Sequence, residues 1–331
     1  MNTNEPELRQ DIVSNDWILL AKSRAKRPHA ELFPPSPQNF TSKRTCPFEN
    51  PRKAGNKIIA SYPEEKNWFV QVIGNKYPAV ITNGTNECPV PFAAGAYRKT
   101  KAVGFHDVIV TRSHERSLGE MTVKEGVMVI EAWRNRMRTL KEQPCVDYII
   151  VFHNHGKAAG ASISHPHSQI ITTPVVPPDV ARSLVGARRF FEEKKECVHC
   201  VVLKEELHEQ KRVIFQNDRF LVFTPFASHV NFEMRIMPLA HELHFEDISP
   251  ADQPLFAEAL INALAALYKK VNNPSYNFFV HTTPPRDHTD FYHWHLEILP
   301  KTTTWAGLEF GTGLETIVVA PEDAAQLLRS K

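Results

Sequence analysis

A pattern of histidines that occurs twice constrains the fold of this chain more than any other feature of its sequence. In the N-terminal half, a predicted strand ends at His114, and the sequence HPH begins 51 positions later at His165. In the C-terminal half, a predicted strand ends at His241, and HWH begins 52 positions later at His293. Because order and spacing agree over this length, the pattern indicates an internal repeat.

Between its histidine motifs, each half carries the pattern of a long amphipathic helix followed by a strand. Apolar residues recur at helical spacing over 122–143 and 249–273, and Ser249 is the expected N-cap of the second helix. Each helix precedes a stretch rich in β-branched and aromatic residues, 146–154 or 274–283, which is typical of strands.

We therefore predict an α+β fold of two half-domains related by internal duplication, each an antiparallel sheet with a long helix packed on it. An early strand or strand pair is expected in each half, at 16–23 and at 212–226. The N-terminal half-domain is predicted to span 1–180 and the C-terminal one 181–331, with the proline-rich segment 172–180 beginning the connection.

Charge and composition argue against several classes of protein. The 331 residues include 39 basic and 37 acidic side chains, a formal net charge of +2, so bulk electrostatics does not favour nucleic acid. No apolar run approaches the length of a bilayer span, and the charged N-terminus lacks a signal-peptide core, so we expect a cytoplasmic protein with no membrane partner. Five cysteines in such a protein predict no disulfide framework, and Cys88 and Cys145 are interpreted as inert packing residues.

Two sets of side chains have the composition of zinc sites, which take about four cysteine, histidine or carboxylate ligands in a tetrahedron. The CVHC sequence places two thiols at a chelating spacing, and its predicted set is Cys197, Cys200, His241 and either His293 or His295. The CPFE sequence has a carboxylate where a second thiol would stand, and its predicted set is Cys46, Glu49, His114 and His165. We expect zinc as the cofactor, with two ions per chain.

The HPHSQ sequence supplies a histidine that the metal does not need. If His165 binds zinc, His167 lies on the same side of the strand and is free to react. An imidazole is a good nucleophile toward phosphorus, and a covalent phosphohistidine divides one difficult transfer into two easier displacements. Gln169 can donate an amide hydrogen bond to phosphoryl oxygens but offers no proton, which favours transfer to a phosphate acceptor over hydrolysis.

Two further segments have the composition of anion-binding sites. Residues 154–164, NHGKAAGASIS, contain small residues that let backbone N–H groups approach a phosphate, and Ser162 adds a hydroxyl. Near the N-terminus, SRAKRP clusters Arg24, Lys26 and Arg27, and a guanidinium can bind a diphosphate through two hydrogen bonds. The alternative interpretation of this basic run is a solvated surface.

Taken together, these motifs resemble the galactose-1-phosphate uridylyltransferase branch of the histidine-triad superfamily. The similarity covers nearly the whole chain, and the sequences that carry it are DWILLAKSRAKRP, CPF, NKYPAV, FHDVIVTRSH, GASISHPHSQ, HWHLEILP and AGLEFGTG. The resemblance implies two histidine-triad-like half-domains and nucleotidyl transfer through a covalent nucleotidyl-histidine, with a nucleotide sugar and a sugar phosphate as partners.

The resemblance also implies roles for the matching residues. His167 would be the nucleophile, with the carbonyl oxygen of Ser164 or a nearby group orienting its ring, and Gln169 would bind the phosphoryl group. The residues implied to line the phosphate and ribose are Asn75, Asn154, Gly160 and Ser162, and Glu309 would contact the sugar. Arg27, with Arg24 beside it in the basic cluster, would reach the diphosphate from the neighbouring subunit, which implies a homodimer.

Departures from the galactose enzymes concern the metal ligands and the acceptor. Those of bacteria pair two thiols where this chain has Cys46 and Glu49, and they lack CVHC, which instead resembles the plant ADP-glucose phosphorylases. Thr303 and Glu315 stand where the galactose enzymes have a lysine and a glutamine that touch the sugar phosphate. The leading prediction is transfer of UMP between UDP-glucose and a hexose 1-phosphate. The alternatives are adenylyl transfer from ADP-glucose to inorganic phosphate, and a metal-stabilised nucleotide-binding protein without transfer activity.

Overall fold

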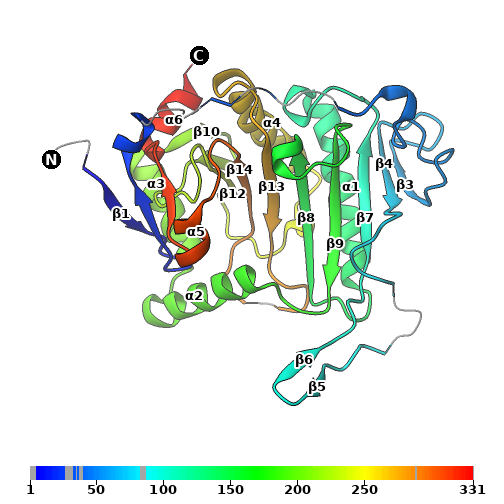
Figure 1. Ribbon diagram of the computed structural model, residues 1–331, viewed down its shortest axis with the longest axis horizontal. Coiled ribbons are helices and arrows are strands. Elements are labelled where there is room, and N and C mark those ends of the chain that lie inside the picture. The colour runs from blue at the N-terminus through cyan, green and yellow to red at the C-terminus, as the bar shows by residue number, and fades with distance from the viewer. Residues whose placement is uncertain are drawn as a thin grey trace.

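Strand pairing joins the two halves of the chain into one continuous sheet. The computed structural model describes residues 5–26, 33–34, 36, 40–82, 87–287 and 289–330. Within these residues, ten strands form an antiparallel sheet in the order β10-β11-β12-β14-β13-β8-β9-β7-β4-β3 (Figure 1). The bounds are β3 (Ile58–Tyr62), β4 (Val70–Gly74), β7 (His106–Thr111), β8 (Tyr148–His155), β9 (His167–Thr173), β10 (Val213–Gln216), β11 (Phe220–Phe223), β12 (Met234–Pro238), β13 (Tyr276–His281) and β14 (His295–Pro300).

Read outward from its centre, the sheet has the same kind of strand order on both sides. The central pair is β8 and β13, where Asn154 lies opposite Asn277. Outward from β8 come β9, β7, β4 and β3, and outward from β13 come β14, β12, β11 and β10. Helices and this antiparallel sheet confirm the predicted α+β class.

The two predicted long helices are present and pack against each other. They are α1 (Val123–Lys141), which Thr122 caps by accepting a hydrogen bond from the backbone of the first turn, and α4 (Gln253–Lys270). The expectation that Ser249 caps α4 is wrong, because the N-cap is Asp252. Ser249 lies three residues earlier, where its hydroxyl donates to the Asp252 carboxylate at 2.7 Å, so it stabilises the turn before the helix.

The main hydrophobic core lies between these helices and one face of the sheet. Its fully buried aromatic residues include Trp133 of α1, Phe256 of α4 and Trp294 just before β14. On β9, Ser168 faces this core, because its hydroxyl accepts a hydrogen bond from the Trp133 indole at 2.7 Å. Side chains alternate along a strand, so His167 and its neighbours at every second position face the opposite side of the sheet.

Further elements lie on the side of the C-terminal half (Figure 1). They are the three-stranded sheet of β1 (Glu7–Gln10), β2 (Trp17–Leu20) and β15 (Glu315–Ile317), and the helices α2 (Pro178–Lys194), α3 (Val198–Glu209), α5 (Gly307–Thr312) and α6 (Pro321–Arg329). Short 3₁₀ helices are η1 (Lys22–Lys26), η2 (Lys43–Thr45), η3 (Leu118–Glu120), η4 (Lys157–Ala159) and η5 (Phe245–Asp247).

This part of the molecule differs from the sequence prediction in one strand assignment. The strand predicted at 16–23 was expected to belong to the antiparallel sheet of the N-terminal half-domain, but β2 lies in the separate three-stranded sheet, where it pairs with β1 and runs parallel to β15. The counterparts of β10 and β11 in the first half are instead β3 and β4. Pairing between strands that are distant in sequence leaves no local pattern. The sequence therefore could not show that β3 and β4, and not the strand at 16–23, lie at this edge of the sheet.

A hairpin of β5 (Phe92–Ala94) and β6 (Tyr97–Lys99) projects from the lower right of Figure 1. Near its base, Cys88 and Cys145 form a disulfide across 57 positions of sequence, with their Cα atoms 5.1 Å apart. The expectation that these cysteines are separate packing residues is therefore wrong. The hairpin segment folds back onto the turn between α1 and β8, a long-range contact that cysteine spacing does not reveal.

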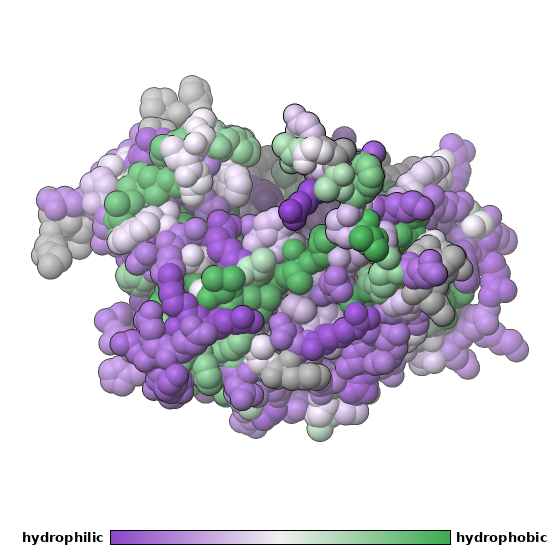
Figure 2. Space-filling view, turned by 90° about the horizontal axis from the view of Figure 1, so that it is seen from below, coloured by the Kyte–Doolittle hydropathy of each residue, from purple (hydrophilic) through white to green (hydrophobic). Residues whose placement is uncertain are grey.

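The described part of the chain contains no helix that is both long enough and apolar enough to cross a membrane. Its surface nevertheless has apolar regions. Figure 2 shows a band of apolar side chains across the middle of the face that points down in Figure 1, with polar side chains on both flanks. Exposed large hydrophobic residues include Val175 and Val185 around α2 and Phe92 and Tyr97 in the hairpin. Exposed apolar surface of this kind is typical of interaction sites.

Candidate active site and metal centres

His167 is held in the orientation of a nucleophile at the start of β9. Its Nδ1–H donates to the carbonyl oxygen of His165 at 2.8 Å, so the lone pair of a neutral ring lies on Nε2. The carbonyl of Ser164 or a nearby group was expected to orient the ring, and the acceptor is the neighbouring His165 carbonyl. Burial lowers the pKa of His167, although the hydrogen bond to His165 opposes this effect. The ring is therefore uncharged at neutral pH.

Gln169 is part of a hydrogen-bonded chain that includes a residue the sequence analysis missed. His106 of β7 has its Nδ1 3.0 Å from the Ala79 N–H, which it accepts, so its proton lies on Nε2. That nitrogen is 2.8 Å from Gln169 Oε1 and donates to it. The Gln169 amide oxygen is therefore occupied, and its NH₂ group remains available to an anion. Asn75 lies beside this chain, where its Oδ1 accepts from the Tyr77 N–H at 2.9 Å.

Asn154 on β8 lies next to His167, one residue beyond the paired His153 and Ser168. Asn277, on the neighbouring strand, donates from Nδ2 to Asn154 Oδ1 at 2.8 Å, which leaves the Asn154 NH₂ as a free donor. This amide faces Gly160, where an added β-carbon would lie 4.0 Å from Asn154 Nδ2. The role of Asn277 was also missed, since only the β8–β13 pairing brings it here.

The loop that carries Gly160 and Ser162 turns tightly over this site. Gly160 has a φ of 85°, in the left-handed region that favours glycine, and ends the 3₁₀ turn η4. Both residues are exposed, as expected for a loop that approaches a ligand with its backbone. The loop is fastened by Ser164, whose hydroxyl accepts from the Thr41 N–H at 3.1 Å.

Two predicted substrate residues are not brought to His167 within the chain. Arg24 in η1 and Glu309 in α5 lie near each other on the side of the C-terminal half, whereas β9 belongs to the other half (Figure 1). Burial of Glu309 is slight, and hydrogen bonds from the Ala306 backbone and the charge of Arg24 lower the pKa of its carboxyl. Arg27, also predicted for the diphosphate, lies outside the described residues.

The first predicted metal set converges around His165. Its Nδ1 lies 3.6 Å from Cys46 Sγ, 3.2 Å from His114 Nδ1 and 3.4 Å from Glu49 Oε1. The Nε2–H groups of both rings donate to backbone carbonyls. His165 Nε2 is 2.7 Å from the carbonyl oxygen of Thr111, and His114 Nε2 is 2.9 Å from the carbonyl oxygen of Thr41. This fixes both tautomers with their Nδ1 lone pairs directed inward, as in metal-binding histidines.

Glu49 lies beside the two histidines of this first set. One of its carboxylate oxygens lies 2.7 Å from His114 Nδ1, on the inner side of the cluster. Cys46, His114 and His165 have ligand atoms within 4.8 Å of one another. A thiol, two imidazoles and a carboxylate of this arrangement fit a zinc ion.

The second predicted metal set also lies together, and of the two candidate histidines it contains His293. Cys200 Sγ lies 3.2 Å from His241 Nδ1 and 3.7 Å from His293 Nδ1, and Cys197 lies in the same group. His295 is turned away, because its Nδ1–H donates to the His293 carbonyl at 3.1 Å. The alternative that the sequence left open therefore resolves in favour of His293.

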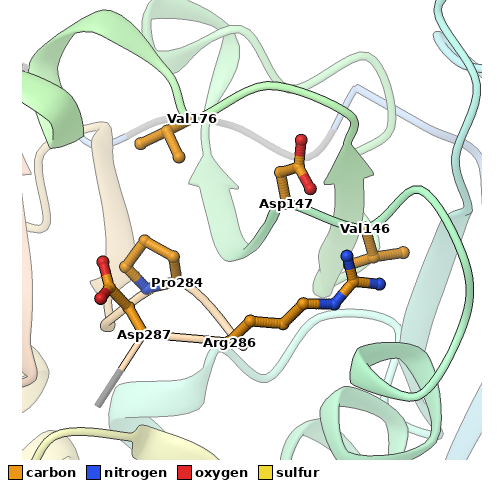
Figure 3. Close-up of a pocket in the computed structure, with 6 residues that line it drawn as sticks. All are labelled: Val146, Asp147, Val176, Pro284, Arg286 and Asp287. Atoms are coloured by element: carbon orange, nitrogen blue, oxygen red, sulfur yellow. The ribbon is translucent and has the colours of Figure 1, made fainter. Parts of the chain in front are cut away.

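A surface pocket of about 220 Å³ lies at the opposite end of β8 from Asn154 (Figure 3). Its lining residues are Val146, Asp147, Val176, Pro284, Arg286 and Asp287, none of which was predicted to act in the site.

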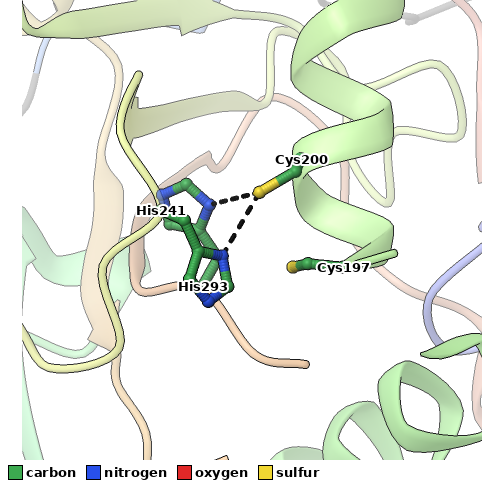
Figure 4. Close-up of side chains that lie close together, drawn as sticks. All are labelled: Cys197, Cys200, His241 and His293. Carbon is green, nitrogen blue, oxygen red and sulfur yellow. Dashed lines mark hydrogen bonds between the residues drawn. The ribbon is translucent and has the colours of Figure 1, made fainter. Parts of the chain in front are cut away.

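The side chains of the second metal set face one another. Figure 4 shows the thiol of Cys200 and the rings of His241 and His293 pointing toward one another, with Cys197 beside them at the start of α3. The hydrogen bond between the two thiols raises the pKa of Cys197 and lowers that of Cys200, which the two histidines lower further.

Known proteins resemble this chain over nearly its whole length. ADP-glucose phosphorylase from Arabidopsis thaliana is 33% identical, over 99% of this chain and 94% of its own. Galactose-1-phosphate uridylyltransferase from Thermotoga maritima is 29% identical, over 98% of both chains. Among solved structures, the Arabidopsis ADP-glucose phosphorylase with bound ADP-glucose superposes with a TM-score of 0.84 at 30% identity, covering 99% of each chain.

The structure of a uridylyltransferase superposes with a TM-score of 0.75 at 27% identity, covering 98% of this chain and 97% of the other. Residues 1–177, more than half of the chain, match the family described as galactose-1-phosphate uridyl transferase, N-terminal domain. These matches agree with the motif HPHSQ, the orientation of His167 and the strand order of the sheet. The chain belongs to the galactose-1-phosphate uridyl transferase family.

Proposed function

We propose that this protein is a nucleotidyltransferase that moves UMP between UDP-glucose and a hexose 1-phosphate by a ping-pong mechanism. The observation that carries the proposal is the orientation of His167, whose Nδ1–H is bonded to the His165 carbonyl and whose Nε2 lone pair is free. The uridylyltransferase relative from Thermotoga maritima supports the choice of reaction.

In the first step, the His167 Nε2 lone pair attacks the α-phosphorus of the nucleotide sugar. A nitrogen–phosphorus bond forms, the bond from that phosphorus to the bridging oxygen breaks, and glucose 1-phosphate leaves with the electron pair. In the second step, a phosphate oxygen of the incoming hexose 1-phosphate attacks the same phosphorus and frees the histidine. Neither nucleophile needs a general base. The His167 imidazole is unprotonated at Nε2, and the phosphate of the hexose 1-phosphate is ionised.

Around this centre, Gln169 donates its NH₂ group to the non-bridging phosphoryl oxygens, since its carbonyl is occupied by His106. Asn154, Gly160 and Ser162 line the phosphate and ribose, and Asn75 binds the ribose. Lowering the pKa of His167 by burial keeps the nucleophile unprotonated. Hydrogen bonds orient His167, Gln169 and Asn154 before substrate binds, which reduces the reorganisation required in the transition state.

The two metal sets are proposed to bind zinc and to have a structural role. Cys46, Glu49, His114 and His165 come from three loops, and His165 lies two residues before the nucleophile, so an ion there would stabilise the turn that orients His167. Cys197, Cys200, His241 and His293 would join α3 to the sheet in the second half. Ligands dispersed in the unfolded chain bind metal only after folding, so zinc would contribute to stability.

A second candidate uses ADP-glucose and inorganic phosphate with the same histidine intermediate. It is favoured by the Arabidopsis ADP-glucose phosphorylase, which resembles this chain at 33% identity. It is also favoured by Glu315, whose carboxylate is paired with His229 of the same chain instead of being free for a sugar phosphate. A metal-stabilised nucleotide-binding protein without transfer activity is disfavoured by the free Nε2 of His167.

We also propose a homodimer in which each active site is completed by the partner subunit. Arg24 and Glu309 lie together on the side of the C-terminal half, away from His167 of the same chain (Figure 1). One twofold operation could bring this pair to the His167 of the second subunit, and it would do so at both sites. The exposed apolar band of Figure 2 offers surface for such an interface.

The division into half-domains 1–180 and 181–331, related by internal duplication, is the corresponding proposal for the fold. It is supported by the matched strand order and by the helices α1 and α4, which occupy the same place in each half. The spacing of the histidine motifs agrees with this relation.

An exchange assay distinguishes the two candidate reactions. Purified protein is incubated with labelled glucose 1-phosphate and either UDP-glucose or ADP-glucose, and label in the nucleotide sugar is measured. We expect exchange with UDP-glucose and no other hexose 1-phosphate, because the labelled glucose 1-phosphate attacks the covalent intermediate and re-forms the nucleotide sugar. Exchange with ADP-glucose alone would support the phosphorylase candidate. Absence of exchange with both would contradict the covalent mechanism.

A further inference from the structure

The disulfide between Cys88 and Cys145 is a feature of the molecule that the proposed reaction does not use. Cys88 is exposed and lies just before the hairpin strand β5, whereas Cys145 is buried in the turn between α1 and β8. The same chain keeps Cys46, Cys197 and Cys200 as thiols. Thiols persist in reducing compartments, where disulfides are typically transient and sense the redox state. An exposed disulfide is also the kind that reductants reach.

The hairpin that this disulfide fastens has no core of its own (Figure 1). Among the described strands, β5 and β6 pair only with each other. All residues at 95–102 are exposed, and so are Val90 and Phe92 on the other side of the hairpin. A two-stranded hairpin of this kind is marginally stable in water. Its position therefore depends on the points where it is attached to the rest of the molecule.

The two ends of the hairpin segment are attached in different ways. After β6, the chain is held on β9: the Phe105 N–H donates to the Thr172 hydroxyl at 2.8 Å, and Gly104 lies so close to the Thr172 carbonyl that no β-carbon fits. Before β5, the chain is held by Ile81, which donates to the Ala102 carbonyl and accepts from the Gly104 N–H, both at 2.9 Å. The disulfide is the covalent attachment of this first end, and reduction removes it.

The first end also carries the hydrogen bond that orients Gln169. The Ala79 N–H, two residues before Ile81, donates to His106 Nδ1 at 3.0 Å, and His106 Nε2 donates to the Gln169 amide oxygen at 2.8 Å. If the chain shifts at this point, the Ala79 bond breaks, and the proton of His106 can then lie on either nitrogen. Gln169 would lose the partner that fixes its amide, so the hairpin attachment is coupled to the active site.

The other half of the disulfide is a firm anchor. Cys145 is buried, and Val146 after it belongs to the main hydrophobic core. The Asp147 N–H donates to the Thr173 carbonyl oxygen at 2.9 Å, which joins this turn to the end of β9. Breaking the sulfur–sulfur bond would therefore loosen the exposed hairpin side and leave the buried turn in place.

We propose that the Cys88–Cys145 disulfide is an exchange site for a dithiol reductant, and that its oxidation state regulates the nucleotidyl transfer. The regulation rests on the proposed function, whereas the exchange site does not. The disulfide form is the more active one, because it holds the Ala79 bond to His106 in place.

The exchange takes place in two steps. A thiolate of the reductant attacks the exposed Cys88 sulfur and forms a mixed disulfide, while the bond to Cys145 breaks and Cys145 leaves with the electron pair and takes up a proton. The second thiolate of the reductant then attacks its own partner sulfur in the mixed disulfide and releases Cys88, which is also protonated. Two electrons pass to the protein, and the reductant becomes a disulfide.

Hydrogen exchange on the folded full-length protein tests the site. The protein is treated with dithiothreitol without denaturant, and alkylation with peptide mapping reports the state of each cysteine. We expect Cys88 and Cys145 to become thiols together, with faster amide exchange at 87–101 and at Ala79 and unchanged exchange on β8. Cys88→Ser, which lacks the disulfide without any reductant, should match the reduced protein. A disulfide that resists dithiothreitol in the folded protein, or unchanged exchange at these amides, would overturn the proposal.

The nucleotidylation rate tests the regulation. Reduction and Cys88→Ser should each lower it by up to about 10-fold, and in a His106→Ala background neither should lower it further, because all act through the orientation of Gln169. Val90→Ser, two positions from Cys88 and exposed, keeps the disulfide and is the matched control, which should change neither the rate nor the amide exchange. Equal rates with and without the disulfide would contradict the regulation. If neither form transfers a nucleotide, the proposed function fails, and the amide exchange still decides whether the disulfide is an exchange site.

Discussion

At the residue scale, the chemistry of the proposed active site depends on which nitrogen of each histidine carries the proton. His167 and the proposed metal-binding residues could be named from the sequence, since each belongs to a motif with a characteristic spacing. His106 and Asn277 could not be predicted, because neither belongs to a recognisable motif of its own. They reach Gln169 and Asn154 only through the pairing of strands that are distant in sequence.

His106 is expected to act as a positioning residue through Gln169. Gln169→Ala removes a donor to the phosphoryl group and should lower the nucleotidylation rate about 100-fold. His106→Ala leaves that amide free to rotate and should lower the rate about 10-fold. If His106 acts through Gln169, the double variant should be no slower than Gln169→Ala in single-turnover kinetics.

The matched control is His155→Ala, on the same sheet, where the ring stacks on Tyr276 with centroids 4.7 Å apart. It should leave the rate near that of the wild type. Independent, multiplying effects of His106→Ala and Gln169→Ala would contradict a positioning role, and a melting temperature for each variant separates this result from loss of folding.

A buried histidine also makes stability depend on pH. Burial lowers the pKa of His153 well below its ordinary value of 6.5, and its ring stacks on Phe278 at 4.8 Å. As the pH falls below 6.5, the unfolded chain binds a proton that the folded chain does not, so the free energy of unfolding decreases.

His153→Gln removes this titration and should flatten the dependence. Between pH 7 and pH 5, we expect the wild type to lose about 2 kcal/mol more than the variant, at about 1.4 kcal/mol per pH unit below 6.5. Urea unfolding at each pH measures the difference. Equal losses in the two proteins would show that His153 is not held neutral.

At the scale of elements, the long helices α1 and α4 could be predicted because their apolar residues recur along 18 or more positions. No helix was predicted at Pro178–Lys194 or Val198–Glu209, where α2 and α3 lie, and the strand predicted at 16–23 pairs in a different sheet. Both differences arise in the layer that covers the C-terminal half. Tertiary contacts, and not local patterns, decide the partners there.

The contact between α2 and the N-terminal turn gives a test of this layer. A β-carbon at Gly186 would lie 1.8 Å from the Val13 carbonyl oxygen, so no side chain fits without displacing the backbone. We expect Gly186→Ala to destabilise the protein by about 1–3 kcal/mol, despite a gain in helix propensity of about 1 kcal/mol. Denaturant unfolding measures the change.

Gly311→Ala in α5 is the control, since nothing lies within 4 Å of its added β-carbon. It should be neutral or stabilising. If Gly186→Ala were as stable as the wild type, α2 would not pack on the N-terminal turn as described.

At the scale of the whole molecule, the two halves share one sheet but differ in what covers it. The proposed active site requires Arg24 or Arg27 and Glu309, yet the described members of this group lie far from His167 of their own chain. The histidine spacing indicated two similar halves, and the strand order of the sheet agrees with it. The separation of these residues could not, because it depends on where β2 and α5 pack.

Mixing two defective variants tests the shared site. Arg24→Ala removes a charge-assisted contact worth about 1.5–3 kcal/mol, and His167→Ala removes the nucleophile. In a mixed dimer, one site would carry both defects and the other neither. After equal mixing and subunit exchange, activity should rise to about a quarter of the wild-type value. No recovery in a sample with demonstrated exchange would place Arg24 within its own chain or outside the site.

The central claim is that His167 forms a covalent bond to the nucleotide. Protein incubated with UDP-glucose and no acceptor is analysed by intact-mass spectrometry and peptide mapping, while released glucose 1-phosphate is quantified. We expect one uridylyl group per chain on His167, none on His295, and one equivalent of glucose 1-phosphate. Transfer by a folded His167→Ala variant at a rate comparable to the wild type, or an adduct on another residue, would contradict it.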